Sequence, residues 1–236
     1  MKKLNLYCLP FAGGSKYSYN AFVKSAPKEI NVIPIEIPGR GSRFKDPLFT
    51  DIQQIADDVF AQIRDGLDVP YAIYGHSMGS LLGYLVTKKI VASGLSHPLH
   101  LFFTGASAPS VEKDSVLRYL LPKEEFKAEL RELGGSPDEI LSDDTLMDFF
   151  EPILRADFEA VETYNHQETQ PFSIPIHVVI GTDEKVSYED ATKWQEETLS
   201  KIKVQQLPGG HFFIFDFVKE IISMISENFK KEIQLK

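Results

Sequence analysis

Short continuous apolar runs alternate along the chain with stretches in which apolar residues recur every three or four positions. The continuous runs predict buried strands, because they are short and end at proline, glycine or polar positions. Strands are expected at these places: Leu4 to Leu9, Val32 to Ile37, Tyr71 to Tyr74, Leu99 to Phe103, Ile176 to Ile180 and Lys203 to Leu207.

The recurring pattern predicts helices between these strands. It runs over residues 51 to 67, where Thr50 or Asp51 can cap the first turn, over residues 79 to 91, and from Phe217 to about Ile233. Strands that alternate with helices are joined by crossover connections. The 236 residues are therefore expected to form one α/β domain, with a mostly parallel central sheet flanked by helices.

Residues 112 to 168 have no strand-like run and are predicted to be a helical insertion in this domain. Apolar residues recur there with helical spacing, and the positions between them are strongly acidic. The insertion has 16 acidic and 6 basic residues, a net charge of −10, whereas the rest of the chain has a net charge of +1. The acidity of the protein therefore resides in this segment.

The whole chain has 34 acidic and 25 basic residues, a net charge of −9. A nucleic-acid-binding protein needs a basic face to replace phosphate counterions, so this class is disfavoured. The single cysteine, Cys8, excludes an intramolecular disulfide and a multi-cysteine zinc site, and no metal-ligand spacing stands out elsewhere. No stretch reaches the ~20 apolar residues of a membrane-spanning helix, and a cytoplasmic location is expected.

The strongest chemical signal is Gly75-His76-Ser77-Met78-Gly79, which lies between a predicted strand and a predicted helix. This is the context that a Gly-x-Ser-x-Gly nucleophile elbow requires. In so tight a turn, side chains at the two glycine positions would collide with neighbouring backbone, and the turn lifts the Ser77 hydroxyl clear of the sheet. An ordinary turn is the alternative, but the strand–turn–helix context favours the elbow.

A serine nucleophile needs a base, and His211 is the best candidate. It follows the last predicted strand in a glycine-containing loop, and a histidine there fits the chain order serine, acid, histidine. His76 lies inside the elbow and is poorly placed to face Ser77. The remaining histidines are interpreted as surface or packing residues: His97, His100, His166 and His177.

The acid of such a triad should follow a strand that lies between the serine and the histidine in sequence. Asp183 and Glu184 come shortly after the predicted strand Ile176 to Ile180. Either carboxylate could hold the tautomer of the imidazole and stabilise its cation. Both remain candidates on this pattern, and either could instead be a solvated loop charge.

Acyl transfer also needs backbone N–H groups that bind the oxyanion. The N–H of Met78, at the start of the helix that follows the elbow, is one candidate. Phe11 or Ala12, in the glycine-rich loop after the first predicted strand, would supply the other. A phosphate-binding loop is rejected there, because no Gly-Lys-Ser/Thr or Gly-x-Gly-x-x-Gly pattern follows.

Together these residues resemble the type II thioesterases of non-ribosomal peptide and polyketide synthesis, which are stand-alone α/β-hydrolases. The resemblance covers nearly the whole chain. It rests on the following marks: Leu9-Pro10-Phe11-Ala12-Gly13-Gly14, Ile37-Pro38-Gly39-Arg40-Gly41, Gly75-His76-Ser77-Met78-Gly79, Leu133-Gly134-Gly135, Leu154-Arg155-Ala156-Asp157-Phe158 and Pro208-Gly209-Gly210-His211-Phe212-Phe213.

The resemblance implies an enzyme that hydrolyses acyl or aminoacyl groups wrongly loaded on the phosphopantetheine arm of a carrier protein. It implies Ser77 as nucleophile, His211 as base, and an oxyanion hole at Met78 and the Phe11-Ala12 loop. It also implies that the insertion is a helical lid over the acyl site. A pair of amphipathic helices that only seals the core is the alternative. No cofactor is expected, because the phosphopantetheine belongs to the substrate.

The chain departs from the family pattern at the acid. The family usually has an aspartate three residues after the glycine that ends the strand, and here that position is Glu184. Residue type favours Asp183 instead, which comes one residue early. Because glutamate can serve as a triad acid, we slightly favour Glu184.

Carrier proteins of this class are usually acidic, as the resemblance implies. Docking is therefore expected on the nearly neutral body, near Arg40 and Arg43, with the acidic lid turned away. A monomer is expected. The alternatives are a medium-chain fatty acyl or acyl-CoA thioesterase or small esterase, and a non-catalytic binding module on the same fold. The presence of Ser77, His211 and an acid argues against the binding module.

Overall fold

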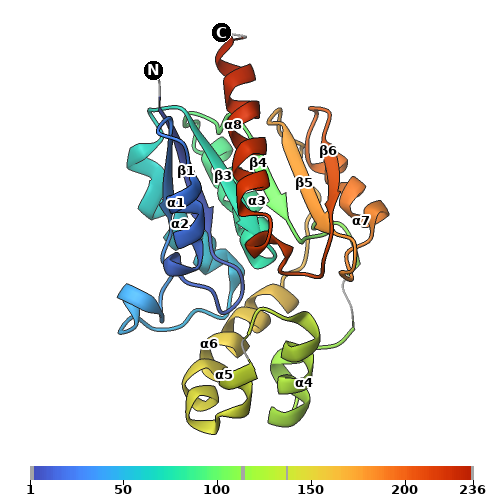
Figure 1. Cartoon of the computed structure of the whole chain (residues 1–236). Helices are drawn as coiled ribbons and strands as arrows, with labels where there is room; N and C mark the ends of the chain where they lie inside the picture. Colours follow the sequence, from blue (N-terminus) through green and yellow to red (C-terminus); the bar gives the residue numbers. More distant parts are fainter. Residues whose placement is uncertain (1–2, 113–114, 137, 235–236) are drawn as a thin grey trace.

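The structure, a computed structural model, describes residues 3–112, 115–136 and 138–234, and its centre is a six-stranded sheet (Figure 1). All strand pairs are parallel, in the order β2-β1-β3-β4-β5-β6. The strands are β1 (Leu4–Leu9), β2 (Ile30–Pro34), β3 (Tyr71–His76), β4 (Leu101–Thr104), β5 (Ile176–Gly181) and β6 (Lys203–Leu207).

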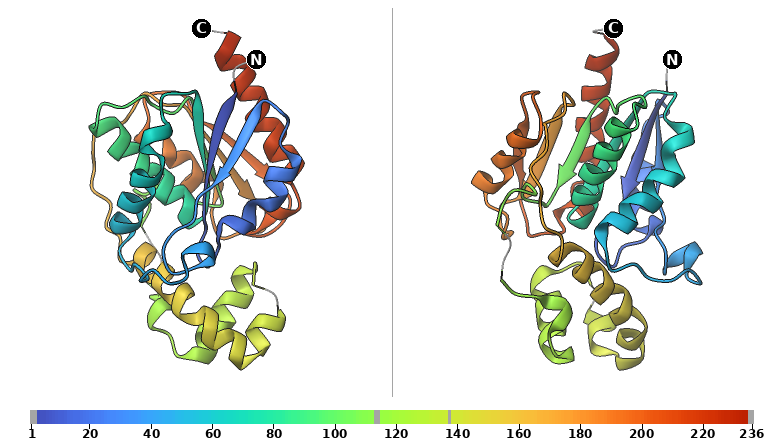
Figure 2. Two further views of the ribbon diagram at one scale, coloured as in Figure 1. Left: turned by 90° about the vertical axis from the view of Figure 1, so that its left-hand side faces the viewer. Right: turned by 180° about the vertical axis from the view of Figure 1, so that it is seen from behind.

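Helices cover both faces of the sheet (Figure 2). Helices α1 and α8 pack on one face, and α2, α3 and α7 on the other. Their bounds are α1 (Asn20–Ser25), α2 (Ile52–Ile63), α3 (Met78–Ala92), α7 (Tyr188–Thr192) and α8 (Val218–Gln234). Short 3-10 helices are found at Lys16–Tyr19, Gly41–Arg43, Arg64–Gly66, Arg118–Leu120, Lys193–Glu197 and Phe213–Phe215.

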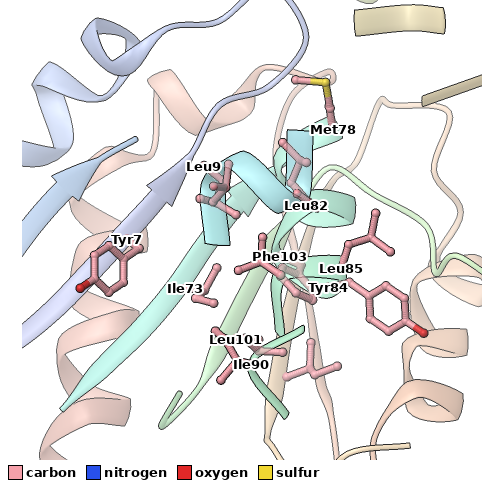
Figure 3. Packing of buried hydrophobic residues seen from close by; sticks show 14 of the residues in the cluster. Tyr7, Leu9, Ile73, Met78, Leu82, Tyr84, Leu85, Ile90, Leu101 and Phe103 are labelled. Carbon is pink, nitrogen blue, oxygen red and sulfur yellow. The ribbon is translucent and has the colours of Figure 1, made fainter. Parts of the chain in front are cut away.

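Helix α3 packs closely against the sheet. Figure 3 shows Leu82 and Leu85 of this helix beside Ile73 of β3 and Phe103 of β4. These four side chains are at most 2% exposed. Burial at this level stabilises the fold by about 1.5–3 kcal/mol for each large apolar side chain. The helix that carries the elbow is thereby fixed on the sheet.

The predicted strands and the three long helices of the body are confirmed, although the ends of β2, β3, β4 and α2 differ by several residues from those expected. The second strand was expected over Val32 to Ile37, but β2 ends at Pro34. The last pair of the β1–β2 ladder is Cys8 with Pro34, and β1 ends one residue later, before Pro10, which has no N–H to continue the ladder. The apolar pattern did not predict α1 or α7, which are short.

The described residues of the segment 112 to 168 contain helices and no strand. Helices α4 (Lys123–Leu133), α5 (Asp138–Ser142) and α6 (Asp144–Glu162) lie beyond the carboxyl ends of the strands (Figure 1). They enclose a small core of their own, made by Phe126, Leu130, Leu141, Met147 and Leu154. None of the helices in the described ranges has a stretch long and apolar enough to cross a membrane.

Two buried histidines lie at the amino ends of the central strands, away from the carboxyl ends. His100 stacks on Phe102 at a ring distance of 4.4 Å, and His177 lies beside both. Burial lowers the pKa of His100 to about 3 and that of His177 to about 4, and the nearby Lys203 adds to both shifts. Both rings therefore stay neutral in the folded protein well below their usual pKa of 6.5.

Acidification should destabilise the fold through these two rings. The unfolded chain takes up protons at these residues below pH 6.5, whereas the folded chain does so only near pH 4 and below, so the free energy of unfolding falls as the pH drops between these values. At pH 5 the loss is up to about 2 kcal/mol for each histidine.

Urea unfolding at pH 7 and pH 5 measures this loss. His177→Gln should flatten the pH dependence, whereas His97→Gln, at an exposed histidine, should leave it unchanged. Equal stability of the unmodified protein at both pH values would contradict the prediction.

Candidate active site

The candidate site lies where the order of strands reverses. The chain passes from β1 to the edge strand β2, then returns to place β3 on the other side of β1. In parallel sheets, ligands bind at the carboxyl ends of the strands at such a point. Because Leu9 pairs with Gly75, the loops that follow β1 and β3 emerge side by side there.

Ser77 occupies the strained turn between β3 and α3. Its φ of 52° makes it the single non-glycine residue with positive φ among the described residues. The turn admits no side chain at its two glycines: a Cβ at Gly75 would overlap the carbonyl of Gly79, and one at Gly79 would overlap the carbonyl of Leu9. Strain of this kind persists where the surroundings enforce it, and here it forms the predicted elbow.

Of the two candidate acids, the structure brings Glu184 to His211. The Oε2 atom of Glu184 lies 2.8 Å from Nδ1 of His211, and its Oε1 accepts the N–H of Gly181 at 2.5 Å. The Glu184 side chain is only 1% exposed. Asp183 points elsewhere, because its Oδ1 accepts from the Thr182 hydroxyl at 3.2 Å in an exposed position.

The loops after β5 and β6 hold this pair together. The N–H of Thr182 donates to the Leu207 carbonyl at 2.9 Å, and the N–H of Asp183 donates to the Gly209 carbonyl at 3.0 Å. The two bonds extend the β5–β6 ladder past the strand ends. The acid loop and the histidine loop are therefore one connected unit.

His76 is buried behind His211 and is not a second base. Its ring is fully buried, 4.8 Å from the ring of His211, and its Nδ1 lies 3.1 Å from the Thr104 hydroxyl. Burial, and to a lesser extent the nearby His211, lower the pKa of His76 well below 6.5. A neutral ring here packs beside His211 without adding a charge.

The residues of the predicted oxyanion hole, Met78 and Phe11 or Ala12, line the same cavity. Met78 is the first residue of α3, so its N–H has no carbonyl partner within the helix. The loop after β1 forms a turn in which the N–H of Gly14 donates to the Phe11 carbonyl at 2.8 Å. Within the described part of the chain, the N–H groups of Phe11 and Ala12 make no hydrogen bond to protein.

These residues border one cavity of about 880 Å³. Ser77, Met78, Ala12, Glu184 and His211 line its floor, beneath the helices of the segment 112 to 168. The apolar side chains that line it from these helices are Leu130, Leu133, Ile140, Phe150, Leu154, Phe158 and Val161. No cluster of three or more metal-ligating side chains is found over the described ranges.

The helical layer touches the histidine and acid loops directly. Gly135 packs so closely on Phe212, which follows His211, that a Cβ at Gly135 would overlap the ring. The Glu132 carboxylate forms an ion pair at 2.8 Å with Lys185, the residue after Glu184. Glu132 lies in the last turn of α4 and Gly135 in the loop that follows, so the carboxyl end of α4 borders the site.

The predicted docking role of Arg40 is corrected by the structure. Arg40 is only 4% exposed and pairs with buried Asp157 of α6 at 2.6 Å, so it presents no free cation to a partner. Arg43 is about one quarter exposed, but it pairs with Asp58 at 2.6 Å and with Asp46 at 2.8 Å. The expectation failed at Arg40 because its partner Asp157 lies 117 residues away, in α6. Docking near Arg43 stays a prediction.

Comparison with known proteins places the chain in a family. A family profile described as "Thioesterase domain" matches residues 4–229. The gramicidin S biosynthesis protein GrsT of Aneurinibacillus migulanus is 35% identical over 229 residues, which cover 97% of this chain and 90% of GrsT.

Solved structures agree with this match. ClbQ from the colibactin NRPS/PKS pathway superposes with a TM-score of 0.94 at 27% identity, covering 100% of both chains. The type II thioesterase BorB from the borrelidin biosynthetic cluster gives a TM-score of 0.88 at 30% identity, covering 96% of this chain and 92% of BorB. The fold, the arrangement of the cavity and these matches lead to one conclusion: the chain belongs to the thioesterase-domain family, and it is a hydrolase.

Proposed function

We propose that this protein is an editing thioesterase, which hydrolyses acyl or aminoacyl thioesters from the phosphopantetheine arm of carrier proteins in non-ribosomal peptide or polyketide synthesis. One observation carries the proposal: Ser77 on a strained elbow and the His211–Glu184 pair, joined at 2.8 Å, line the same apolar-roofed cavity. The relatives named above support the substrate class.

In the proposed acylation step, Nε2 of His211 takes the proton of the Ser77 hydroxyl while Oγ attacks the thioester carbonyl. Glu184 holds the proton on Nδ1, so Nε2 is the free acceptor, and it stabilises the imidazolium that forms. The oxyanion rests on the N–H of Met78 and on the Phe11–Ala12 loop, each donor worth about 3 kcal/mol. The C–S bond breaks, and His211 returns the proton to the departing thiol.

In the second step, His211 takes a proton from water, which attacks the acyl-serine carbonyl. The tetrahedral intermediate uses the same donors, and collapse returns the proton to Ser77 Oγ and releases the carboxylic acid. The chain supplies every group in this scheme, so we propose that no cofactor is needed.

The segment 112 to 168 acts as a lid in this proposal. Its apolar side chains both form the small core of the segment and line the roof of the cavity, where Leu154 and Phe158 of α6 take part in both. A pure sealing role would not place these residues over Ser77 and His211 in one cavity. The apolar roof favours an apolar acyl chain over a charged one.

The test of carrier specificity compares one acyl group on two donors. A carrier protein and coenzyme A, both loaded with the same acyl group, should differ in kcat/KM by at least about tenfold in favour of the carrier, which corresponds to about 1.4 kcal/mol of docking energy. Ser77→Ala provides the blank for both substrates. Equal kcat/KM for the two donors would instead favour an acyl-CoA thioesterase or small esterase.

We further propose that the enzyme acts as a monomer in the cytoplasm, and that carrier proteins are its partners. The expectation of a reducing compartment rests on the single cysteine, Cys8, which is fully buried. The net charge of −9 makes nucleic acid an unsuitable partner.

A further inference from the structure

We infer that Asp157, clamped by Arg40, is a positioning residue that holds the oxyanion loop Phe11–Gly14 in its working geometry; this rests on the proposed acyl-transfer function. Asp157 lies in α6 of the helical layer, 117 residues from Arg40 along the chain. Asp157 is 0% exposed and Arg40 is 4% exposed. The two side chains are enclosed between α6 and the loop after β1.

The carboxylate of Asp157 has two partners that fix its orientation. Arg40 donates from Nη1 to Oδ2 at 2.6 Å and from Nη2 to Oδ1 at 2.7 Å, a bidentate pair. The backbone N–H of Gly13 donates to the same Oδ2 at 2.7 Å. Charge-assisted bonds of this kind are short and directional, so the position of Gly13 follows that of Asp157.

Arg40 holds the next residue of the loop. Its Nη1 also donates to the Gly14 carbonyl at 3.2 Å, so the Arg40–Asp157 pair binds two polar groups of the turn, the Gly13 N–H and the Gly14 carbonyl. The N–H of Gly14 closes the turn onto Phe11. The Gly13 and Gly14 amides are therefore occupied, and those of Phe11 and Ala12 make no hydrogen bond to the protein over the described ranges.

Leu154, one helical turn before Asp157 in α6, contacts the same loop. Gly13 has a φ of +75°, and a Cβ there would lie 2.5 Å from Cδ2 of Leu154. Residues three apart share one face of a helix, so Leu154 and Asp157 contact the loop together. Helix α6 thus connects the roof of the cavity to the oxyanion donors.

Stability alone does not explain a buried ion pair at this place. The cost of desolvating both charges offsets most of their attraction, and an apolar pair of similar volume would hold α6 on the body as well. An apolar pair could not accept the N–H of Gly13 or bind the carbonyl of Gly14. The specific contribution of Arg40 and Asp157 is the direction they impose on the turn.

The test measures the steady-state hydrolysis of an acyl thioester by the Asp157→Asn variant. The rate is expressed per folded molecule, and circular dichroism gives the folded fraction. A misdirected oxyanion donor affects the transition state and leaves substrate binding intact, so kcat should fall by up to about 100-fold while KM changes little. The inhibition constant of an alkyl trifluoromethyl ketone, whose hemiketal carries an oxyanion, should rise by the same factor as kcat falls.

Glu151→Gln is the matched control, because it breaks an ion pair with Arg155 within α6 and does not touch the loop. It should keep the kcat of the unmodified protein. Folded Asp157→Asn with unchanged kcat and ketone affinity would overturn the inference. If that variant does not fold, Arg40→Lys keeps the charge but loses the bidentate clamp, and unchanged kcat there would overturn it equally.

Amide hydrogen exchange tests the same inference on the unmodified protein, without a variant. The Gly13 N–H should exchange slowly, and exchange at the rate of an open loop would overturn the inference. Failure of the proposed function is distinguishable, because the unmodified protein would then show no Ser77-dependent turnover, whatever the protection of Gly13.

Discussion

Replacing Ser77 with alanine should reduce kcat by about 10⁶-fold, close to the loss found when the nucleophile of a serine hydrolase triad is removed. The expected residual rate comes from the oxyanion donors and from substrate binding, which do not depend on the hydroxyl. Release of free thiol from an acyl pantetheine, followed by a thiol reagent, measures the loss. A serine-directed fluorophosphonate should label the unmodified protein and not the variant.

The matched control for this change is Ser93→Ala at the other end of α3, where Ser93 is exposed and remote from the cavity. Its kcat should equal that of the unmodified protein. Both variants should keep the melting temperature, because neither hydroxyl makes a hydrogen bond to the described residues. A Ser77→Ala variant that retained more than about one hundredth of the activity would indicate water as the direct nucleophile.

Replacing Glu184 with glutamine should lower kcat by about 10³- to 10⁴-fold without unfolding the protein. The Gly181 N–H would keep the side-chain carbonyl as its acceptor, so the amide nitrogen would face Nδ1 of His211. A donor at that position forces the proton onto Nε2, which can then no longer accept the proton of Ser77. The amide also cannot stabilise the imidazolium.

Asp183→Asn is a stringent control, because the two carboxylates are adjacent in sequence and only one of them contacts His211. It should retain the kcat and KM of the unmodified protein. Steady-state kinetics of the two variants, side by side, decide the assignment. Activity retained by Glu184→Gln and lost by Asp183→Asn would contradict the geometry described here.

The alternation of strands and helices was predictable because the apolar pattern reports it locally. The pattern has period two or none in strands and about 3.6 in helices such as α2, whose buried residues lie on one face. The elbow was predictable for a related reason, since a turn this tight tolerates only glycine at Gly75 and Gly79.

The sequence alone could not show which of the two carboxylates, Asp183 or Glu184, contacts His211. A shift of one residue in a loop changes the direction of the side chain, and that direction is set here by the bond from the Asp183 N–H to the Gly209 carbonyl. Gly209 lies in another loop. The position of the family acid indicated Glu184, but only the meeting of the two loops shows which carboxylate faces His211.

The role of Arg40 was missed for a similar reason. Its partner Asp157 was counted among the acidic positions of a solvated helix face, yet it is fully buried. A carboxylate and a guanidinium separated by 117 residues give no periodic signal. Arg40 and Asp157 each lie in a motif that carries the family resemblance. That shared membership was the single sign in the sequence that the two residues pair.

Acyl groups are expected to pass through Ser77 as a covalent intermediate, and the mass of the enzyme during turnover reveals it. A carrier protein loaded with an acyl group is mixed with the enzyme, the reaction is quenched in acid within one turnover, and the mass of the enzyme and of its peptides is determined. We expect an increase equal to the acyl group, confined to the peptide that contains Ser77. Release of the acyl group with no adduct at Ser77, or with an adduct elsewhere, would contradict an acyl-enzyme at Ser77.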